Sequence, residues 1–352
     1  MSVNRDIVAQ RIAGGRLATY DLESRKGTSA TEVFMLSDVF KVGPSELIQT
    51  EFAAYTGLRE GLGDEAYRSF MPSVELVVSE SGGPWVMELE WLGEQLFTFF
   101  QDTRGMLDRR GDVPRIVHDR LATANSVVEQ SLQHFTTMFE RTRTDNAGLM
   151  KAYFTELVIA LRSNLRKGGI LESTEDDIAA IASRPDRFLS GVPASACHRD
   201  VATDNIYFRR SEDARWLTVK FADPRRYLPF LESAEMAAVD HTPPAWGSVA
   251  ADYAALWISL SREEQEIRHQ RSSIHLDAHK SVRAAVENAV TRGLFSQSFF
   301  TLNLAVFTSL YVGCKCEYCL DPVRKWLYDQ MVVECRRLLG LCRQHAQGHR
   351  VF

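Results

Sequence analysis

The stretch Ala196-Cys197-His198-Arg199-Asp200-Val201-Ala202-Thr203-Asp204-Asn205-Ile206-Tyr207-Phe208 decides the fold. It contains the pattern H-R-D-x-x-x-x-N, and an apolar run follows the asparagine directly. A charged turn at 209–215 leads to a second run, Leu217-Thr218-Val219-Lys220-Phe221, and then to Asp223. Two apolar runs of strand length joined by a charged turn predict a β-hairpin. Residues at the ends of its two neighbouring strands would therefore converge on one point.

These residue types suit the transfer of a phosphoryl group. A carboxylate such as Asp200 can orient an attacking hydroxyl group and accept its proton. The amide oxygen of Asn205 and the carboxylate of Asp223 can hold Mg²⁺ against nucleotide phosphates, because hard cations prefer oxygen ligands. The pattern at 198–205 is only suggestive by itself, and the strand and aspartate that follow strengthen it.

The sequence before this hairpin predicts a five-stranded antiparallel sheet. Residues 1–17 predict a short helix, and turn residues then separate five runs of strand composition. The expected strands are 18–25, 31–36, 39–42, 70–78 and 85–92. Lys41 interrupts the third run, and taken alone it would be a strand lysine that points to water.

A helix is expected directly after the third strand. Pro44 would direct the chain into it and Ser45 would cap it. Glu51 lies in this helix, ten residues after Lys41. A strand lysine that faces a helix glutamate is the pair that positions the α- and β-phosphates of a nucleotide in phosphoryl-transfer enzymes. Without the pattern at 198–223, Glu51 would be explained equally well as a solvated helix residue.

The end of the last strand is the expected contact for a purine ring. Backbone N–H and C=O groups recognise the flat edge of a purine, and Glu90 and Trp91 would present such groups. Gly93 follows them as a hinge.

From residue 113 the apolar spacing becomes helical. We expect helices at 113–141, 146–166, 175–183, 247–257, 261–271, 278–291 and 322–345, and a buried one at 299–312. Ser173 or Thr174 would cap the helix at 175–183. The acids around this cap either line a polar pocket or only favour the start of a helix; they are Glu172, Glu175, Asp176 and Asp177.

Composition limits the classes of protein and partner. The chain has 352 residues, of which 45% are hydrophobic, enough for one large domain or two. Its formal net charge of −5 argues against a general nucleic-acid binder. There is no long apolar run and no secretory segment at Met1-Ser2-Val3-Asn4-Arg5-Asp6. We therefore expect a cytoplasmic protein with reduced cysteines that binds neither nucleic acid nor membrane, and the oligomeric state is not predicted.

One cysteine cluster allows two interpretations. Cys314, Cys316 and Cys319 form C-x-C-x-x-C, and further candidate ligands are Cys335, Cys342 and His345. A structural zinc site is possible. The paired C-x-x-C knuckles that usually mark such a site are absent, so reduced cysteines that pack in the interior are the favoured interpretation.

The combined order of these features resembles the aminoglycoside phosphotransferase-like family, the small-molecule branch of the protein-kinase-like fold. The resemblance covers about residues 15 to 260, and its specific pieces are Phe40-Lys41-Val42-Gly43 and 198–205. It implies an α+β, bilobal fold with a small antiparallel-sheet N-terminal lobe that carries one helix, and a large, mainly helical C-terminal lobe. Residues 1–92 would bind the nucleotide, and residues 93–352 would be catalytic and bind the substrate. ATP or another nucleoside triphosphate, with Mg²⁺, would lie between the lobes.

The resemblance also implies roles by position. They are Asp200 as catalytic base, Asn205 and Asp223 as metal ligands, Lys41 and Glu51 as the phosphate-positioning pair, and Asp252 as the aspartate that braces the catalytic loop from a helix start. We expect His198 to be a buried hydrogen-bonding support for this loop. Cys197 would be an inert core residue.

The sequence departs from the pattern in several places. Its first turn holds a single glycine, Gly27, where protein kinases have G-x-G-x-x-G, and Asp223 is followed by Pro224-Arg225. No A-P-E-like element follows, and the interval from Asp223 to Asp252 is long. These departures speak against a protein kinase and suit the small-molecule branch.

The sequence therefore predicts an ATP- and Mg²⁺-dependent O-phosphotransferase. Its acceptor would be a hydroxyl group of a small molecule such as an aminoglycoside-type antibiotic, a sugar or a nucleoside, and antibiotic modification is one such activity. A kinase-fold protein that binds a nucleotide or a partner without catalysis is the alternative, and a protein kinase is a weaker one. The acceptor, its reacting hydroxyl group and the choice between ATP and GTP are not predicted.

Overall fold

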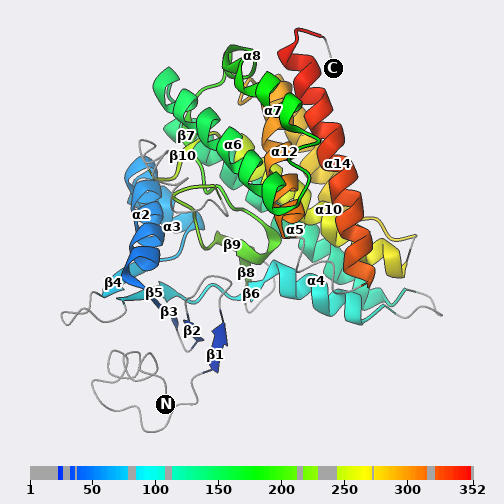
Figure 1. Cartoon of the computed structure of the whole chain (residues 1–352). Coiled ribbons are helices and arrows are strands. Elements are labelled where there is room, and N and C mark those ends of the chain that lie inside the picture. Colours follow the sequence, from blue (N-terminus) through cyan, green and yellow to red (C-terminus); the bar gives the residue numbers. More distant parts are fainter. Residues whose placement is uncertain are drawn as a thin grey trace.

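The computed structural model describes residues 23–26, 32–35, 38–77, 85–107, 113–211, 217–228, 244–271, 273–314 and 322–349. The helix predicted at 1–17 lies outside these residues. A small sheet with two helices forms one end of the molecule, and a larger group of helices forms the other (Figure 1). Among the helices of the described ranges, none has the length and apolar character needed to cross a membrane.

The five-stranded antiparallel sheet is present as predicted. Its strands are β1 (Glu23–Lys26), β2 (Glu32–Met35), β3 (Asp38–Gly43), β4 (Val74–Val77) and β5 (Trp85–Glu90). Their order is β1-β2-β3-β5-β4, so β3 is central. Lys41 on β3 lies opposite Val33 on β2 and Met87 on β5. A central strand is hydrogen-bonded on both sides, and it holds Lys41 in a fixed place.

Two helices accompany this sheet. In α2 (Ser45–Leu62) the buried side includes Tyr55 and Leu58, and α3 (Asp64–Phe70) follows after Gly63, which has φ +77°. The predicted cap by Ser45 is wrong, since Pro44 is the N-cap residue and no side chain caps the helix. The carbonyl of Pro44 accepts the first helical hydrogen bonds instead, so Ser45 is already helical. The sequence pattern predicted only α2, because α3 is too short to show a helical period.

The hairpin predicted from 196–223 is also present. It consists of β8 (Ile206–Arg210) and β9 (Leu217–Phe221), with Ile206 opposite Phe221. A 3₁₀ turn, η1 (Thr203–Asn205), leads into β8. Short strands hold the surrounding chain: β6 (Glu94–Gln95) pairs with β8, and β7 (Ser195–Ala196) pairs with β10 (Trp246–Gly247).

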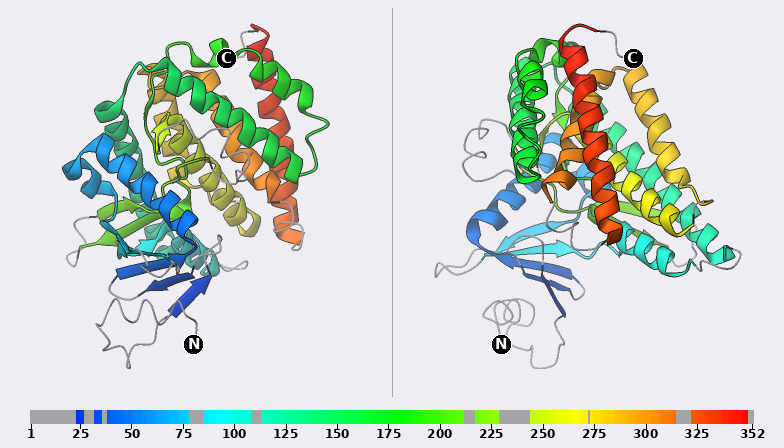
Figure 2. Two further views of the ribbon diagram at one scale, coloured as in Figure 1. Left: turned by 60° about the vertical axis from the view of Figure 1, so that its left-hand side comes forward. Right: turned by 45° about the vertical axis from the view of Figure 1, so that its right-hand side comes forward.

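The rest of the described chain is mainly helical. The helices are α4 (Leu96–Gly105), α5 (Arg115–Thr142), α6 (Ala147–Lys167), α7 (Glu175–Ala182), α8 (Pro185–Leu189), α10 (Ala250–Gln270), α11 (Asp277–Thr291), α12 (Gln297–Gly313) and α14 (Pro322–Ala346). Buried along almost its whole length, α12 packs against α6, α10 and α14 (Figures 1 and 2). It is the buried helix expected near 299–312.

Three details of this helical part differ from the predictions. One continuous helix, α10, replaces the two expected at 247–257 and 261–271, because no glycine or proline lies between them. Neither α4 nor α8 was predicted. The predicted cap by Thr174 is absent, because its hydroxyl group donates to the carbonyls of Ile170 and Leu171.

Part of the cysteine cluster for which zinc was the less favoured interpretation can be assessed. Cys316 and Cys319 lie outside the described residues. Cys335 and Cys342 are buried in α14 as free thiols, and burial raises the pKa of Cys335 to about 12. Within the ranges that the structure describes, no group of three or more His, Cys, Asp or Glu side chains is placed to hold a metal ion.

An aromatic cluster joins the sheet end to the helices. Phe221 at the end of β9 is fully buried, and its ring centroid lies 6.4 Å from that of Phe70 on α3. On the other side it lies 5.7 Å from His134 and 5.6 Å from Phe135, both on α5. The His198 ring lies 5.9 Å away. The residue before the loop at 222–225 is therefore fixed by both parts of the molecule.

His134 gives a prediction about pH and stability. Burial lowers its pKa to about 4, well below the 6.5 of an exposed histidine. Between these values the unfolded chain binds a proton that the folded chain does not, so the free energy of unfolding should fall as the pH falls. In urea titrations from pH 7 to pH 4.5, the free energy of unfolding of His134→Phe should fall by up to about 1.4 kcal/mol less per pH unit than that of the parent protein. Parallel curves would contradict the burial of a neutral His134.

Candidate active site

Lys41 connects two carboxylates that come from distant parts of the sequence. Its Nζ donates to Oε1 of Glu51 at 2.7 Å and to Oδ1 of Asp223 at 2.6 Å. Lys41 comes from the central strand, Glu51 from the second turn of α2, and Asp223 from the end of the hairpin. The structure therefore brings together these three predicted site residues.

The charges at this junction alter one another's ionisation. Burial lowers the pKa of Lys41, but the carboxylates of Asp223 and Glu51 outweigh it and hold the pKa above its usual value. Burial opposes the ionisation of Asp223, yet the positive charges of Lys41 and Arg225 hold its pKa below the usual range. Asp223 is consequently an anion. Burial raises the pKa of Glu51 to about 7 against the attraction of Lys41.

The backbone of Asp223 has an uncommon conformation. Its φ is +59°, which costs a residue with a side chain on the order of 1 kcal/mol or more. Its N–H donates to the hydroxyl group of Tyr55 on α2 at 2.9 Å. The hydrogen bond to the Tyr55 hydroxyl group and the ion pair with Lys41 hold the residue in place. The sequence pattern did not indicate this role of Tyr55.

Asp200 lies beside Arg225. Its Oδ2 accepts from Nε of Arg225 at 2.9 Å, and its side chain is 15% exposed. Burial raises the pKa of Asp200 to about 6, and the charge of Arg225 acts in the opposite direction. The backbone carbonyl of Asp200 accepts from Ala202 N and from Nδ2 of Asn205.

This last hydrogen bond fixes the orientation of the Asn205 amide. Because Nδ2 donates to the Asp200 carbonyl at 2.8 Å, the remaining polar atom of the side chain is the oxygen Oδ1. The carbonyl of Asn205 also accepts from Ala222 N at 2.9 Å across the hairpin. Asn205 and the residue before Asp223 are thus direct neighbours, as the hairpin predicted.

Asp252, in the first turn of α10, supports the loop at 197–205. It is fully buried, and its two oxygens accept from His198 N at 3.0 Å and from Arg199 N at 2.7 Å. Burial raises the pKa of Asp252 to about 7, and the two N–H donors act against this rise. The backbone N–H groups of His198 and Arg199 are thereby satisfied inside the core.

His198 supports the same loop through its backbone. Its carbonyl accepts from Arg225 N at 3.0 Å. Its ring is fully buried against Phe221, and neither ring nitrogen has a hydrogen-bond partner in the described part of the chain. Burial lowers the pKa of His198 to about 3, so the ring is neutral.

A buried ion pair at Arg199 was not predicted from the sequence. This residue has φ +69°, and its guanidinium group donates to both carboxylate oxygens of Glu156 on α6 at 3.1 Å. It donates further to the carbonyls of Arg226 and Trp246. Neither Arg199 nor Glu156 is exposed to solvent. The signal in the sequence was an acid at position 156, directly before the apolar run Leu157-Val158-Ile159-Ala160.

Glu90 and Trp91 lie where the chain leaves the sheet. The Glu90 carboxylate pairs with Lys220 on β9 at 2.8 Å, and Trp91 stacks on the guanidinium group of Arg209 at 4.7 Å. Gly93 has φ +100° and lies so close to β8 that a Cβ atom would meet the Phe208 carbonyl at 2.4 Å. The Glu90 N–H already donates to the Ser73 carbonyl at 3.0 Å, and the Trp91 side chain remains 40% exposed.

Comparison with known proteins gives structural similarity only. The sequence matches no known family and no curated protein. The solved structure of a glucosamine kinase is 16% identical, with a TM-score of 0.50 over 93% of this chain and 79% of the kinase. The chain has the fold of that kinase. The predicted α+β, protein-kinase-like bilobal fold is confirmed.

Two further structures have TM-scores below 0.5. Aminoglycoside 2'-phosphotransferase-IIIa in its GDP complex is 11% identical, with a TM-score of 0.49 over 96% of this chain and 99% of the phosphotransferase. Choline kinase LicA from Streptococcus pneumoniae is 13% identical, with a TM-score of 0.45 over 96% of this chain and the full length of that one.

The support from Asp252 gives a testable prediction. In Asp252→Asn one acceptor oxygen becomes an N–H₂ donor that faces a backbone N–H, which should lower the free energy of unfolding by about 1–3 kcal/mol. Hydrogen exchange followed by mass spectrometry should show faster exchange in a peptide that covers 197–205. Asp204→Asn is the matched control, because Asp204 lies in the same loop and its side chain is exposed. Equal exchange in the two variants would contradict the bracing role.

Proposed function

We propose that the chain is an ATP- and Mg²⁺-dependent O-phosphotransferase that acts on a hydroxyl group of a small molecule. One observation carries the proposal. The junction of Lys41, Glu51 and Asp223 lies where β9 ends. Asp200 and Asn205 precede β8 at the same end of the hairpin. A protein that only bound a partner would not need this combination of an acid, an amide, a metal-type carboxylate and a lysine–glutamate pair.

The nucleotide is proposed to bind between residues 1–92 and residues 93–352. Lys41 would contact its phosphates, and Glu51 would hold the lysine from α2. Backbone groups of Glu90 and Trp91 would contact the base. The Glu90 side chain binds Lys220, and the Trp91 side chain stacks on Arg209.

The residues present fit Mg²⁺. Asn205 presents an oxygen because its nitrogen is occupied, and Asp223 is held as an anion by the neighbouring positive charges. Amide and carboxylate oxygens are the donors that Mg²⁺ takes from proteins at phosphate sites. The metal ion would neutralise charge on the transferred phosphoryl group.

Asp200 is the proposed base. Arg225 occupies its Oδ2, so Oδ1 is the oxygen that would accept the proton of the acceptor hydroxyl group. The acceptor oxygen forms a bond to the γ-phosphorus, the bond from that phosphorus to the β–γ bridging oxygen breaks, and ADP leaves. The proton passes to Asp200. His198 is not the base in this scheme, because it is buried and neutral.

The acceptor is proposed to lie in the helical part, between α5, α6 and the catalytic loop. The acids near the start of α7 do not contribute to this proposal. Glu175 pairs with Arg162 at 2.7 Å, and Asp177 pairs with Arg343 at 3.0 Å. Arginine side chains therefore bind both carboxylates. This favours the interpretation that the acids only stabilise the start of the helix and do not line a substrate pocket.

Loss of the base should affect turnover more than binding. In Asp200→Asn we expect kcat to fall by about 10²–10⁴ while the affinity for ATP changes little. Turnover is measured by ADP release in the presence of a working acceptor, and affinity by calorimetry. Asp204→Asn, with the same charge change in the same loop, should keep most of its turnover. If Asp200→Asn kept it too, Asp200 could not be the base.

Loss of the metal carboxylate should affect binding that depends on Mg²⁺. The affinity of Asp223→Asn for ATP with Mg²⁺ should fall by about tenfold or more, because one anionic ligand is lost. Without Mg²⁺ the affinity should not fall, since the variant releases Lys41 for the phosphates. An unchanged enhancement by Mg²⁺ in calorimetric titrations would show that Asp223 is only structural.

A further inference from the structure

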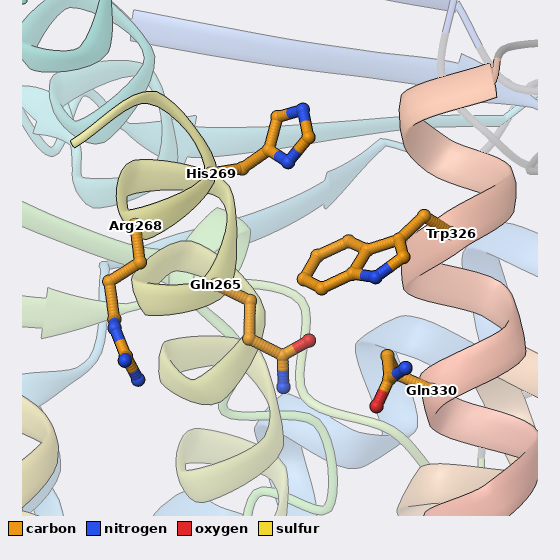
Figure 3. Close-up of a pocket in the computed structure, with 5 residues that line it drawn as sticks. All are labelled: Gln265, Arg268, His269, Trp326 and Gln330. Carbon is orange, nitrogen blue, oxygen red and sulfur yellow. The ribbon is translucent and has the colours of Figure 1, made fainter. Parts of the chain in front are cut away.

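A groove lies between α10 and α14, outside the site described above. It has a volume of about 450 Å³ and is lined by Gln265, Arg268, His269, Trp326 and Gln330. The first three residues belong to the last turns of α10, and the other two to the first turns of α14. Figure 3 shows the Trp326 indole between the two helices, with the carboxamides of Gln265 and Gln330 below it.

This groove is remote from the catalytic loop. Asp252, which binds that loop, lies in the first turn of α10, and Gln265 follows 13 residues later. At 1.5 Å per residue the two positions are roughly 20 Å apart along the helix. A ligand in the groove would therefore not be the acceptor whose hydroxyl group attacks the γ-phosphorus.

The groove has one aromatic wall. Trp326 is 41% exposed, so part of its indole is open to solvent. The centroid of its ring lies 5.6 Å from that of His269, with the planes inclined by 32°. The histidine thus holds the indole in place.

The other lining groups are polar. Trp326 and Gln330 are four residues apart on α14, and Gln265 and His269 are four apart on α10, so each pair lies on one helix face. Oε1 of Gln265 is buried and has no hydrogen-bond partner. The guanidinium group of Arg268 points away from the indole (Figure 3). Among the described residues that line the groove there is no carboxylate.

These features select among ligand classes. A cation would find no opposite charge among the described lining residues, and a hydrocarbon chain would leave two carboxamides unpaired. A nucleobase can also stack on an indole, so nucleosides are included in the test below. A sugar ring presents a single apolar C–H face and a border of hydroxyl groups. Carboxamides, which both donate and accept, suit that border.

We propose that this groove binds a sugar ring, either a monosaccharide or one unit of an oligosaccharide. The C–H face of the sugar stacks on Trp326, and its hydroxyl groups bind the carboxamides of Gln265 and Gln330. The proposal does not rest on the proposed phosphotransferase activity. A protein without that activity would keep the site.

The test is a binding screen of the full chain with neutral and amino monosaccharides, their short oligomers, and nucleosides. Saturation-transfer NMR identifies ligands, and calorimetry measures their affinity. We expect at least one sugar to bind, and Trp326→Ala to weaken it by about tenfold or more. Gln265→Leu, which retains the indole, should weaken the same sugar.

Val333→Ala is the control, because it truncates an exposed apolar side chain of α14 outside the lining residues. It should bind the sugar as the parent does. The proposal is overturned if no sugar binds, if only nucleosides bind, or if the sugar binds Trp326→Ala as tightly as the parent. Asp200→Asn should retain sugar binding at the groove, which separates this result from a failure of the phosphotransferase proposal.

Discussion

The buried carboxylate of Asp252 fixes the loop on which the rest of the site depends. It binds two successive backbone N–H groups, those of His198 and Arg199, in a segment that forms no regular ladder. Burying a charge is costly unless its hydrogen-bonding capacity is met, and hydrogen bonds to a carboxylate are about twice as strong as neutral ones. With these two groups fixed, the Arg199 side chain points into the core and reaches Glu156. The side chain of Asp200, the next residue, remains 15% exposed.

A second buried junction connects the sheet to this loop. Lys41 binds the carboxyl groups of Glu51 and Asp223, and Arg225 binds that of Asp200. Each ionised group of the proposed site therefore already has a partner within the protein. A bound nucleotide with Mg²⁺ would have to replace some of these contacts, above all the contact of Lys41 with Asp223. The site is thus held in shape by the charges that the proposed reaction would use.

The sequence predicted those parts of the site that have local patterns. The spacing from 198 to 223 predicted the hairpin, and that pattern singled out Lys41 in its strand and Glu51 in its helix as the lysine–glutamate pair. The ion pair between Arg199 and Glu156 joins residues 43 positions apart, and no local pattern encodes such a contact. The role of Tyr55 has no local pattern either, since only the folded chain brings its hydroxyl group to Asp223 N. The missed α4 and α8 are short, and α8 begins at a proline.

The most direct test of the central claim is transfer of the labelled γ-phosphate of ATP, with Mg²⁺, to a panel of acceptors. The panel should hold aminoglycosides, amino and neutral sugars, nucleosides, choline-like alcohols, peptides and proteins, and mass spectrometry would identify the products. The account predicts a phosphate monoester on at least one small hydroxyl compound, and none when Mg²⁺ is removed. Phosphorylation of peptides or proteins alone, or binding of ATP without transfer to any acceptor, would contradict it.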